Sequence, residues 1–155
     1  MSLLDETLIY EMEIGVISGG SKKDKKKEKH KGVTNAELMA ILEKGSPLRN
    51  LPPRPVIQLT IDHVNENMLD EITDRALEAY ITDGQKALED SLNKDCLRVQ
   101  EYAQDIIYDS DTNGLLEPNA PSTIKRKGFN HPLFVTGELA RSITCVLVNE
   151  KGEKV

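Results

Sequence analysis

The residues that most often carry out chemistry are few in this chain, and they are widely spaced. Its three histidines are His30, His63 and His131, and none has a second histidine or cysteine three or four residues away. Helical and turn zinc sites need ligands paired in that way. Cys96 and Cys145 lie far apart in the sequence and outside any metal-ligand spacing. Two separate thiols indicate a reducing cytoplasm rather than a disulfide framework.

A short acidic segment is similar to the start of a calcium-binding loop. Asp109, Asp111, Asn113 and Gly114 have the offsets of an EF-hand loop, but its twelfth position is Ala120 instead of a bidentate carboxylate. A polar turn is therefore the simpler interpretation. Since no nucleophile is paired with a base in the sequence either, we expect a protein that is not an enzyme and that uses no cofactor or metal.

The charges are distributed unevenly along the chain. The 155 residues include 26 Asp and Glu against 20 Lys and Arg, and this acidity argues against a general nucleic-acid-binding protein. Residues 21–31 nevertheless carry a net charge of +5, which leaves −11 on the remainder. We expect 21–32 to be a mobile, solvated loop, with contact to DNA or to an acidic partner as the alternatives. The candidate contacts are Lys22, Lys23, Lys25, Lys26, Lys27, Lys29 and Lys31.

The size and composition predict one domain over residues 1–155. A chain of this length buries a substantial core, and that core must be aliphatic because there is no Trp and there are only two Phe. We find neither a signal peptide pattern nor an apolar run of membrane length. The sequence therefore predicts a protein made in the cytoplasm, with no membrane as a partner.

Two segments have the period of β-strands. Apolar and polar residues alternate over residues 7–16, which predicts a half-buried strand with Glu11 and Glu13 facing water. Residues 143–148 are almost continuously apolar, which predicts a second strand buried on both faces. We interpret residues 149–155 as a tail.

Helical periods lie between the two strands. A short helix beginning at Thr34 or Asn35 and ending at Gly45 has an apolar face formed by Leu38, Ile41 and Leu42. A 3.6-residue period from Asp62 predicts a long helix, in which Gly84 is the point where the helix bends or breaks.

Three further segments complete the predicted fold. Residues 56–61 fit either a strand or the first turns of the long helix. A second helix is expected from about Asp95 to Tyr108, and a single turn over Glu138–Ser142. The fold class is α+β: a small antiparallel sheet covered by one long and one or two shorter helices, with long proline-rich loops.

Residues 46–55 and 109–135 are expected to be extended, proline-rich loops. Both phenylalanines of the chain lie in the second loop, where they either seal the loop onto its own sheet or anchor a partner. We expect Arg49 and Arg54 to point outward from the first loop, since arginine suits carboxylate contacts at interfaces. The interface candidates are Arg49, Arg54, Lys125, Arg126, Phe129, Leu133, Phe134 and Arg141.

Two blocks of residues resemble a known family. The first block begins with Pro-Asn-Ala-Pro-Ser-Thr-Ile at Pro118 and continues through Arg126-Lys127-Gly128, Pro132-Leu133, Thr136-Gly137-Glu138-Leu139 and Ser142-Ile143. The second lies upstream and comprises residues 36–43, Gly45 and Asn50-Leu51-Pro52-Pro53-Arg54-Pro55. Together these blocks resemble the neck proteins of tailed bacteriophages, the tail-completion or virion morphogenesis proteins that join head to tail.

The resemblance implies a structural virion protein made in the bacterial host cytoplasm. It implies a homo-oligomeric ring of six subunits at the head-proximal end of the tail. The ring would contact the tail-tube or tail-terminator protein on one side and the head connector or stopper protein on the other, while DNA passes through its lumen without sequence-specific binding. The alternatives are a small DNA-binding accessory protein acting through residues 22–31, and a regulatory or inhibitor module that forms no oligomer.

Overall fold

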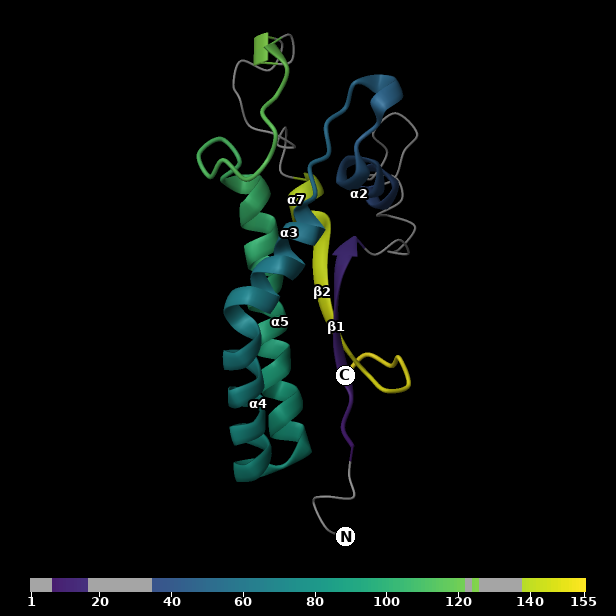
Figure 1. Ribbon diagram of the computed structural model, residues 1–155. Helices are drawn as coiled ribbons and strands as arrows, with labels where there is room; N and C mark the ends of the chain where they lie inside the picture. Colours follow the sequence, from purple (N-terminus) through teal and green to yellow (C-terminus); the bar gives the residue numbers. More distant parts are fainter. Residues whose placement is uncertain (1–6, 17–34, 122–123, 126–137) are drawn as a thin grey trace.

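The computed structural model describes residues 7–16, 35–121, 124–125 and 138–155, and it confirms the α+β class (Figure 1). A ribbon of two strands lies beside a hairpin of two helices, and shorter helices cover one end of the ribbon. The elements in chain order are β1 (Tyr10–Val16), α2 (Asn35–Lys44), α3 (Val56–His63), α4 (Leu69–Asp83), α5 (Gln85–Tyr108), α7 (Glu138–Ser142) and β2 (Ile143–Asn149).

The sheet is formed by the first and last strands of the chain. β1 and β2 pair antiparallel, from Tyr10 opposite Asn149 to Val16 opposite Ile143. Because successive side chains of a strand point to opposite faces, the two faces of β1 differ. Glu11 and Glu13 are exposed and the apolar residues between them are half-buried, as the alternation predicted.

β2 lies against α5 and is the more buried strand. Ile143 and Leu147 have less than 2% of their surface exposed. The residues after β2, which we interpreted as a tail, turn back onto the fold. The Val155 amide donates to the Leu147 carbonyl at 3.0 Å, and Asn93 Nδ2 donates to the Val155 carbonyl at 3.2 Å.

Residues 56–61 are helical, which resolves the ambiguity left by the sequence. α3, a π-helical segment at Val64–Met68 and α4 form one run of 28 residues. Leu77 and Ile81 continue the 3.6-residue apolar period that predicted this helix, and the period therefore places them on its buried face. In the structure they are 55% and 73% exposed. The apolar face predicted for α4 is wider than the face that is buried. The reason is that α4 packs mainly against one helix, α5, and a narrow apolar stripe on α4 covers that single neighbour.

Gly84 ends α4 and reverses the chain. Its φ of 85° lies in the region that favours glycine, and α5 then returns alongside α4 (Figure 1). The predicted break is confirmed, but the expected start of a helix near Asp95 is wrong. α5 runs for 24 residues from Gln85, because no glycine or proline interrupts the chain between Gly84 and Tyr108.

α2 has the predicted bounds but a different buried face. Met39 and Leu42 are buried, whereas Ile41 is 36% exposed. The helix is rotated relative to our prediction because it packs against β1, α3 and α7, a surface that its own sequence does not specify. There Met39 and Leu42 join Val56, Ile106 and other residues in the larger of two core clusters.

Candidate interaction surface

A closed turn projects from the end of the molecule beyond α2. Pro47–Arg49 form one turn of 3-10 helix, and Asn50 completes it with a φ of 51°. Ser46 and Leu51 exchange two backbone hydrogen bonds, each 2.9 Å long. The turn is therefore fixed by its own backbone and does not need a partner to define its shape.

Leu48 lies at the tip of this turn and is 99% exposed. Single exposed leucines are common on protein surfaces and by themselves indicate little. Leu48 differs in that a turn closed by backbone hydrogen bonds presents it, so little conformational entropy is left to lose when a partner covers it. No pattern in the sequence predicted that Leu48 would be exposed in this way. The sequence feature that could have indicated Leu48 is a single leucine between Pro47 and Arg49 in a proline-rich segment.

Gly45 connects α2 to the turn and has a φ of 69°. A Cβ atom at this position would lie 2.7 Å from both the Leu51 carbonyl oxygen and the Pro53 nitrogen. Backbone atoms cannot move aside as a flexible side chain can. The path of the chain into and out of the turn therefore requires glycine here.

Arg54 joins the two proline-rich loops from the inside. Its Nε atom donates to the Glu117 carbonyl at 2.9 Å, and Nη2 donates to the Pro118 carbonyl at 3.0 Å. The prediction that Arg54 points outward is wrong, because the residue is 7% exposed. Burial lowers the pKa of the guanidinium from its usual value, and nearby Glu117 partly offsets this effect.

Glu43 links α2 to the beginning of α3. Its Oε1 accepts a hydrogen bond from the Ile57 amide at 2.5 Å, and Oε2 accepts one from the Gln58 amide at 3.4 Å. These amides belong to the first turn of α3, where Pro55 offers no side-chain cap. Burial raises the pKa of the Glu43 carboxyl, and the two amide hydrogen bonds oppose that shift.

Replacing Glu43 with alanine is expected to lower the free energy of unfolding by about 1–2 kcal/mol, since the first turn of α3 loses its only side-chain acceptor among the described residues. Urea unfolding followed by circular dichroism measures this loss. Glu66→Ala is the matched control, because Glu66 is an exposed helical glutamate. Equal midpoints for Glu43→Ala and the wild type would show that the cap contributes nothing.

The remaining interface candidates are only partly covered by the structure. Lys125 and Arg141 are both exposed. Several other candidates lie outside the described residues: the side chain of Arg49, all of Arg126, Phe129, Leu133 and Phe134, and Lys22, Lys23, Lys25, Lys26, Lys27, Lys29 and Lys31. Within the described part of the chain, the structure therefore brings Arg54 together with the 117–118 backbone.

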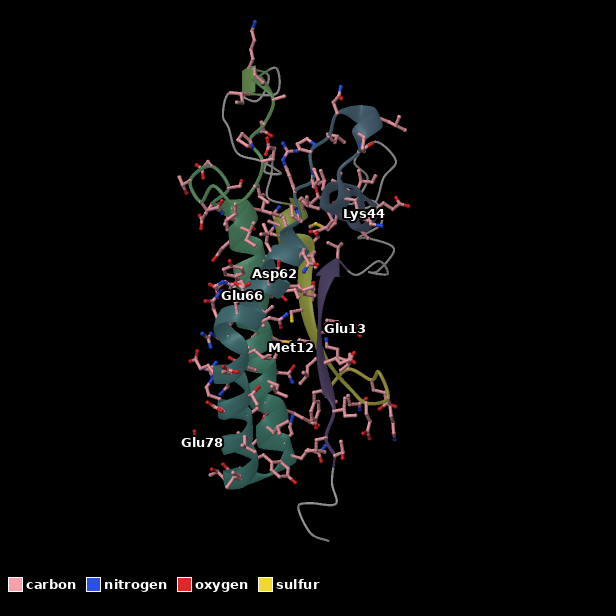
Figure 2. All side chains as sticks on the ribbon, in the orientation of Figure 1. Met12, Glu13, Lys44, Asp62, Glu66 and Glu78 are labelled. Atoms are coloured by element: carbon pink, nitrogen blue, oxygen red, sulfur yellow. The ribbon has the colours of Figure 1, made fainter. Side chains whose placement is uncertain are left out.

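The acidic charge is concentrated on the helical hairpin. Residues 62–117 contain 15 Asp and Glu against four Lys and Arg. Figure 2 shows Asp62, Glu66 and Glu78 along this run, and all three side chains are exposed. Nearby, the pKa of the Asp105 carboxyl is raised by burial and by the neighbouring negative charges of Asp109 and Glu101.

One acidic side chain is buried between the two helices of the hairpin. Asp95 on α5 is 2% exposed, and its Oδ1 accepts hydrogen bonds from Arg75 Nη2 on α4 at 2.6 Å and from Arg98 Nη1 at 3.1 Å. Arg75 also pairs with Glu71. Because removal of one partner from a buried ion pair is costly, this contact fixes α4 against α5.

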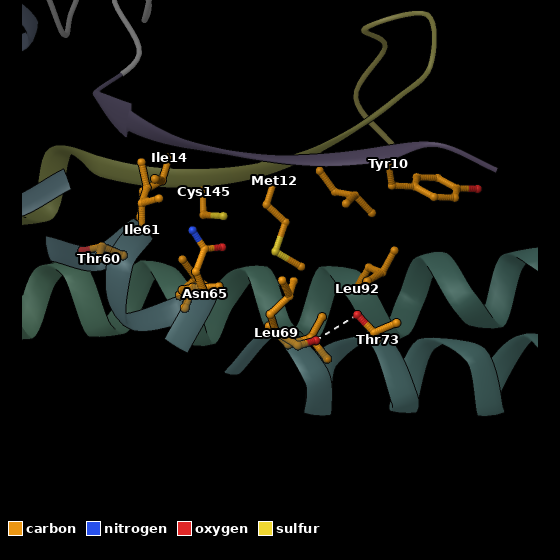
Figure 3. A pocket seen from close by; sticks show the side chains of 14 residues that line it. Tyr10, Met12, Ile14, Thr60, Ile61, Asn65, Leu69, Thr73, Leu92 and Cys145 are labelled. Carbon is orange, nitrogen blue, oxygen red and sulfur yellow. Dashed lines mark hydrogen bonds between the residues drawn. The ribbon is translucent and has the colours of Figure 1, made fainter. Parts of the chain in front are cut away.

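An apolar groove separates β1 from α4 (Figure 3). Its volume is about 310 Å³. Met12 from β1 and Leu69 from α4 point toward one another across it, with Leu92 of α5 beside them. Cys145 from β2 also lines the groove. The groove therefore extends to the side chain of Cys145, a residue that is only 7% exposed.

Within residues 7–16, 35–121, 124–125 and 138–155, no group of three or more His, Cys, Asp or Glu is placed to hold a metal ion. His63 stacks on the Tyr102 ring, with centroids 3.9 Å apart. None of the helices in the described part of the chain is long and apolar enough to span a bilayer.

Comparisons with models of protein families, with curated proteins and with solved structures found no match.

Proposed function

We propose that this chain is a structural protein of a phage neck, which completes the tail and joins it to the head connector as a ring around the DNA channel. The observation that carries the proposal is the fixed turn that presents Leu48, 99% exposed, within the upstream of the two blocks of residues that resemble that family. A buried apolar anchor surrounded by polar residues is the usual centre of a subunit contact. In this proposal Leu48 binds a neighbouring subunit or a neck partner.

The charge distribution supports the same proposal. A surface that lines a DNA channel must let the phosphate backbone slide, and exposed carboxylates do not bind phosphate. The α4–α5 hairpin, with its excess of Asp and Glu, has this property. We propose that the hairpin faces the lumen or the outer wall of the ring, and that contacts between subunits use the end that carries the turn.

Electron microscopy of particles made without this gene tests the proposed function. The experiment uses lysates of the source virus or prophage with the gene deleted. We expect filled heads and finished tails to accumulate separately, and to join when purified protein is added. Normal joined particles in the deletion lysate would overturn the proposal.

Replacing Leu48 with aspartate is expected to weaken head–tail joining roughly ten- to thirtyfold, because a charge replaces an apolar anchor at the contact. Monomer stability should not change, since Leu48 makes no buried contact. Titration of the variant into the deletion lysate measures joining, and urea unfolding measures stability. Leu97→Asp is the control, because Leu97 is 64% exposed on α5, away from the turn. Equal joining by both variants would remove Leu48 from the interface.

The alternative function is DNA binding through residues 22–31. The +5 charge of residues 21–31 favours it, in contrast to the acidic helices. Binding of the purified protein to DNA that falls steeply with salt, and that is lost when residues 22–31 are deleted, would support the alternative. Absence of such binding at low salt would exclude it.

A further inference from the structure

The two cysteines, far apart in the sequence, meet between α5 and β2. Their sulfur atoms lie 3.0 Å apart, and both residues are buried, at 3% exposure for Cys96 and 7% for Cys145. A disulfide bond has a sulfur–sulfur distance of about 2.05 Å, so a shift of about 1 Å separates this thiol pair from a covalent bond. The sequence indicated two separate thiols, and the tertiary structure makes them neighbours.

Neighbouring contacts fix how α5 lies against β2 at this point. Gln100, one helical turn after Cys96, accepts a hydrogen bond from the Cys145 amide at 3.0 Å. Gln104, one turn further, donates to the Ile143 carbonyl at 3.2 Å. Residues four apart lie on the same face of a helix, so three successive turns of α5 contact β2. The closeness of the thiols is therefore determined by the backbone arrangement and not only by side-chain rotation.

The chemistry of the pair favours oxidation. The two sulfur atoms share a hydrogen bond in which either thiol can be the donor. This contact lowers the pKa of Cys96 and raises the pKa of Cys145. The thiolate is the reactive form of cysteine. Cys145 also lines the groove shown in Figure 3, so a molecule as small as a peroxide in this groove lies next to the Cys145 side chain, and the Cys96 sulfur is 3.0 Å further on.

We propose that Cys96 and Cys145 are a redox-active pair that a peroxide converts into an intramolecular disulfide joining α5 to β2. One thiol reduces the peroxide by two electrons and becomes a sulfenic acid, with release of water or an alcohol. The second thiol then attacks the sulfenic sulfur, the S–S bond forms, and a water molecule leaves. The inference does not depend on the proposed function.

The protein would have two forms, a reduced form with two thiols and an oxidised form with the Cys96–Cys145 disulfide. Cytosolic thiols are kept reduced, so the pair is a dithiol in a growing cell and becomes a disulfide in oxidising surroundings. The bond closes a loop between residues 96 and 145, which contains the 109–135 segment with its interface candidates. By restricting the unfolded chain, it stabilises the protein that carries those candidates.

Treatment of the purified full-length protein with hydrogen peroxide tests the proposal. We expect the intact mass to fall by two hydrogens, a non-reducing peptide map to join the Cys96 and Cys145 peptides, and Tm to rise by roughly 5–15 °C. A dithiol reductant should reverse all three changes. The mass and the peptide map need no variant, so they decide the question even where a substitution impairs folding.

A Cys96→Ala/Cys145→Ala double variant is the control for the shift in Tm, because it cannot form the disulfide. Peroxide should change its Tm only through methionine oxidation, which also occurs in the wild type.

Three results would overturn the proposal. They are sulfinic acid on either cysteine without a crosslink, disulfides only between molecules, or a Cys96–Cys145 bond that forms only in denaturant.

Discussion

Replacing Gly45 with alanine is expected to lower the free energy of unfolding by about 2–4 kcal/mol. Two effects add at this position. An L-residue with a φ of 69° is strained, at a cost of about 1 kcal/mol or more. The new Cβ would also lie 2.7 Å from two backbone atoms, so the chain on one side of the turn must shift. Urea unfolding measures the loss.

Gly114→Ala separates the two effects. Gly114 has a φ of 67°, nearly that of Gly45, but a Cβ there would meet no atom within 4 Å. Its substitution should therefore cost only the backbone strain, about 1 kcal/mol. If both variants lose the same free energy of unfolding, the close approach of Gly45 to Leu51 and Pro53 does not contribute to the loss in Gly45→Ala. In the proposed neck role, Gly45→Ala should also impair joining, because it displaces the turn that presents Leu48.

Replacing Arg54 with alanine is expected to lower the free energy of unfolding by about 2–4 kcal/mol. The substitution removes two hydrogen bonds from a charged donor, each worth about 1.5–3 kcal/mol, and leaves the Glu117 and Pro118 carbonyls without their donor. Water reaches these carbonyls once the side chain is gone, which keeps the loss below the sum of the two bonds. Thermal and urea unfolding measure the effect.

Arg54→Lys tests whether geometry or charge matters. A lysine keeps the positive charge, but its single ammonium cannot reproduce the fork that reaches two successive carbonyls. We expect the lysine variant to recover less than half of the lost stability. Full recovery would show that Arg54 acts as a point charge near Glu117 instead of joining two loops. Hydrogen exchange of Leu116, which is buried beside this contact, gives a local measurement of the same effect.

The Arg54 and Gly45 variants together bear on the proposed interaction surface. Arg54 is buried and Gly45 is half-buried, and each holds a segment of the proposed interaction surface. Stability and joining should therefore fall together in these variants, whereas Leu48→Asp should affect joining alone. This contrast distinguishes residues that build the surface from a residue that contacts the partner.

The sequence by itself determined the elements whose signal is local. The alternation that begins at residue 7 predicted β1, and the exposure of Glu11 and Glu13 follows from the two-residue period of a strand. Gly84 predicted the end of α4, because helix interiors disfavour glycine and the turn needs a positive φ. The Glu138–Ser142 helix has the predicted bounds, and the strand that follows it begins at the predicted residue and ends one residue later, at Asn149. Each of these follows from interactions within a few residues.

Only the tertiary structure decided which surfaces meet. Met39 is buried in place of Ile41 because the position of α2 over the sheet, and not its own periodicity, selects the face. Arg54 turns inward because carbonyls more than 60 residues away need a donor there. Cys96 and Cys145 become neighbours for the same reason, since α5 and β2 pack together. Contacts between distant segments depend on the whole fold, and no short stretch of sequence specifies them.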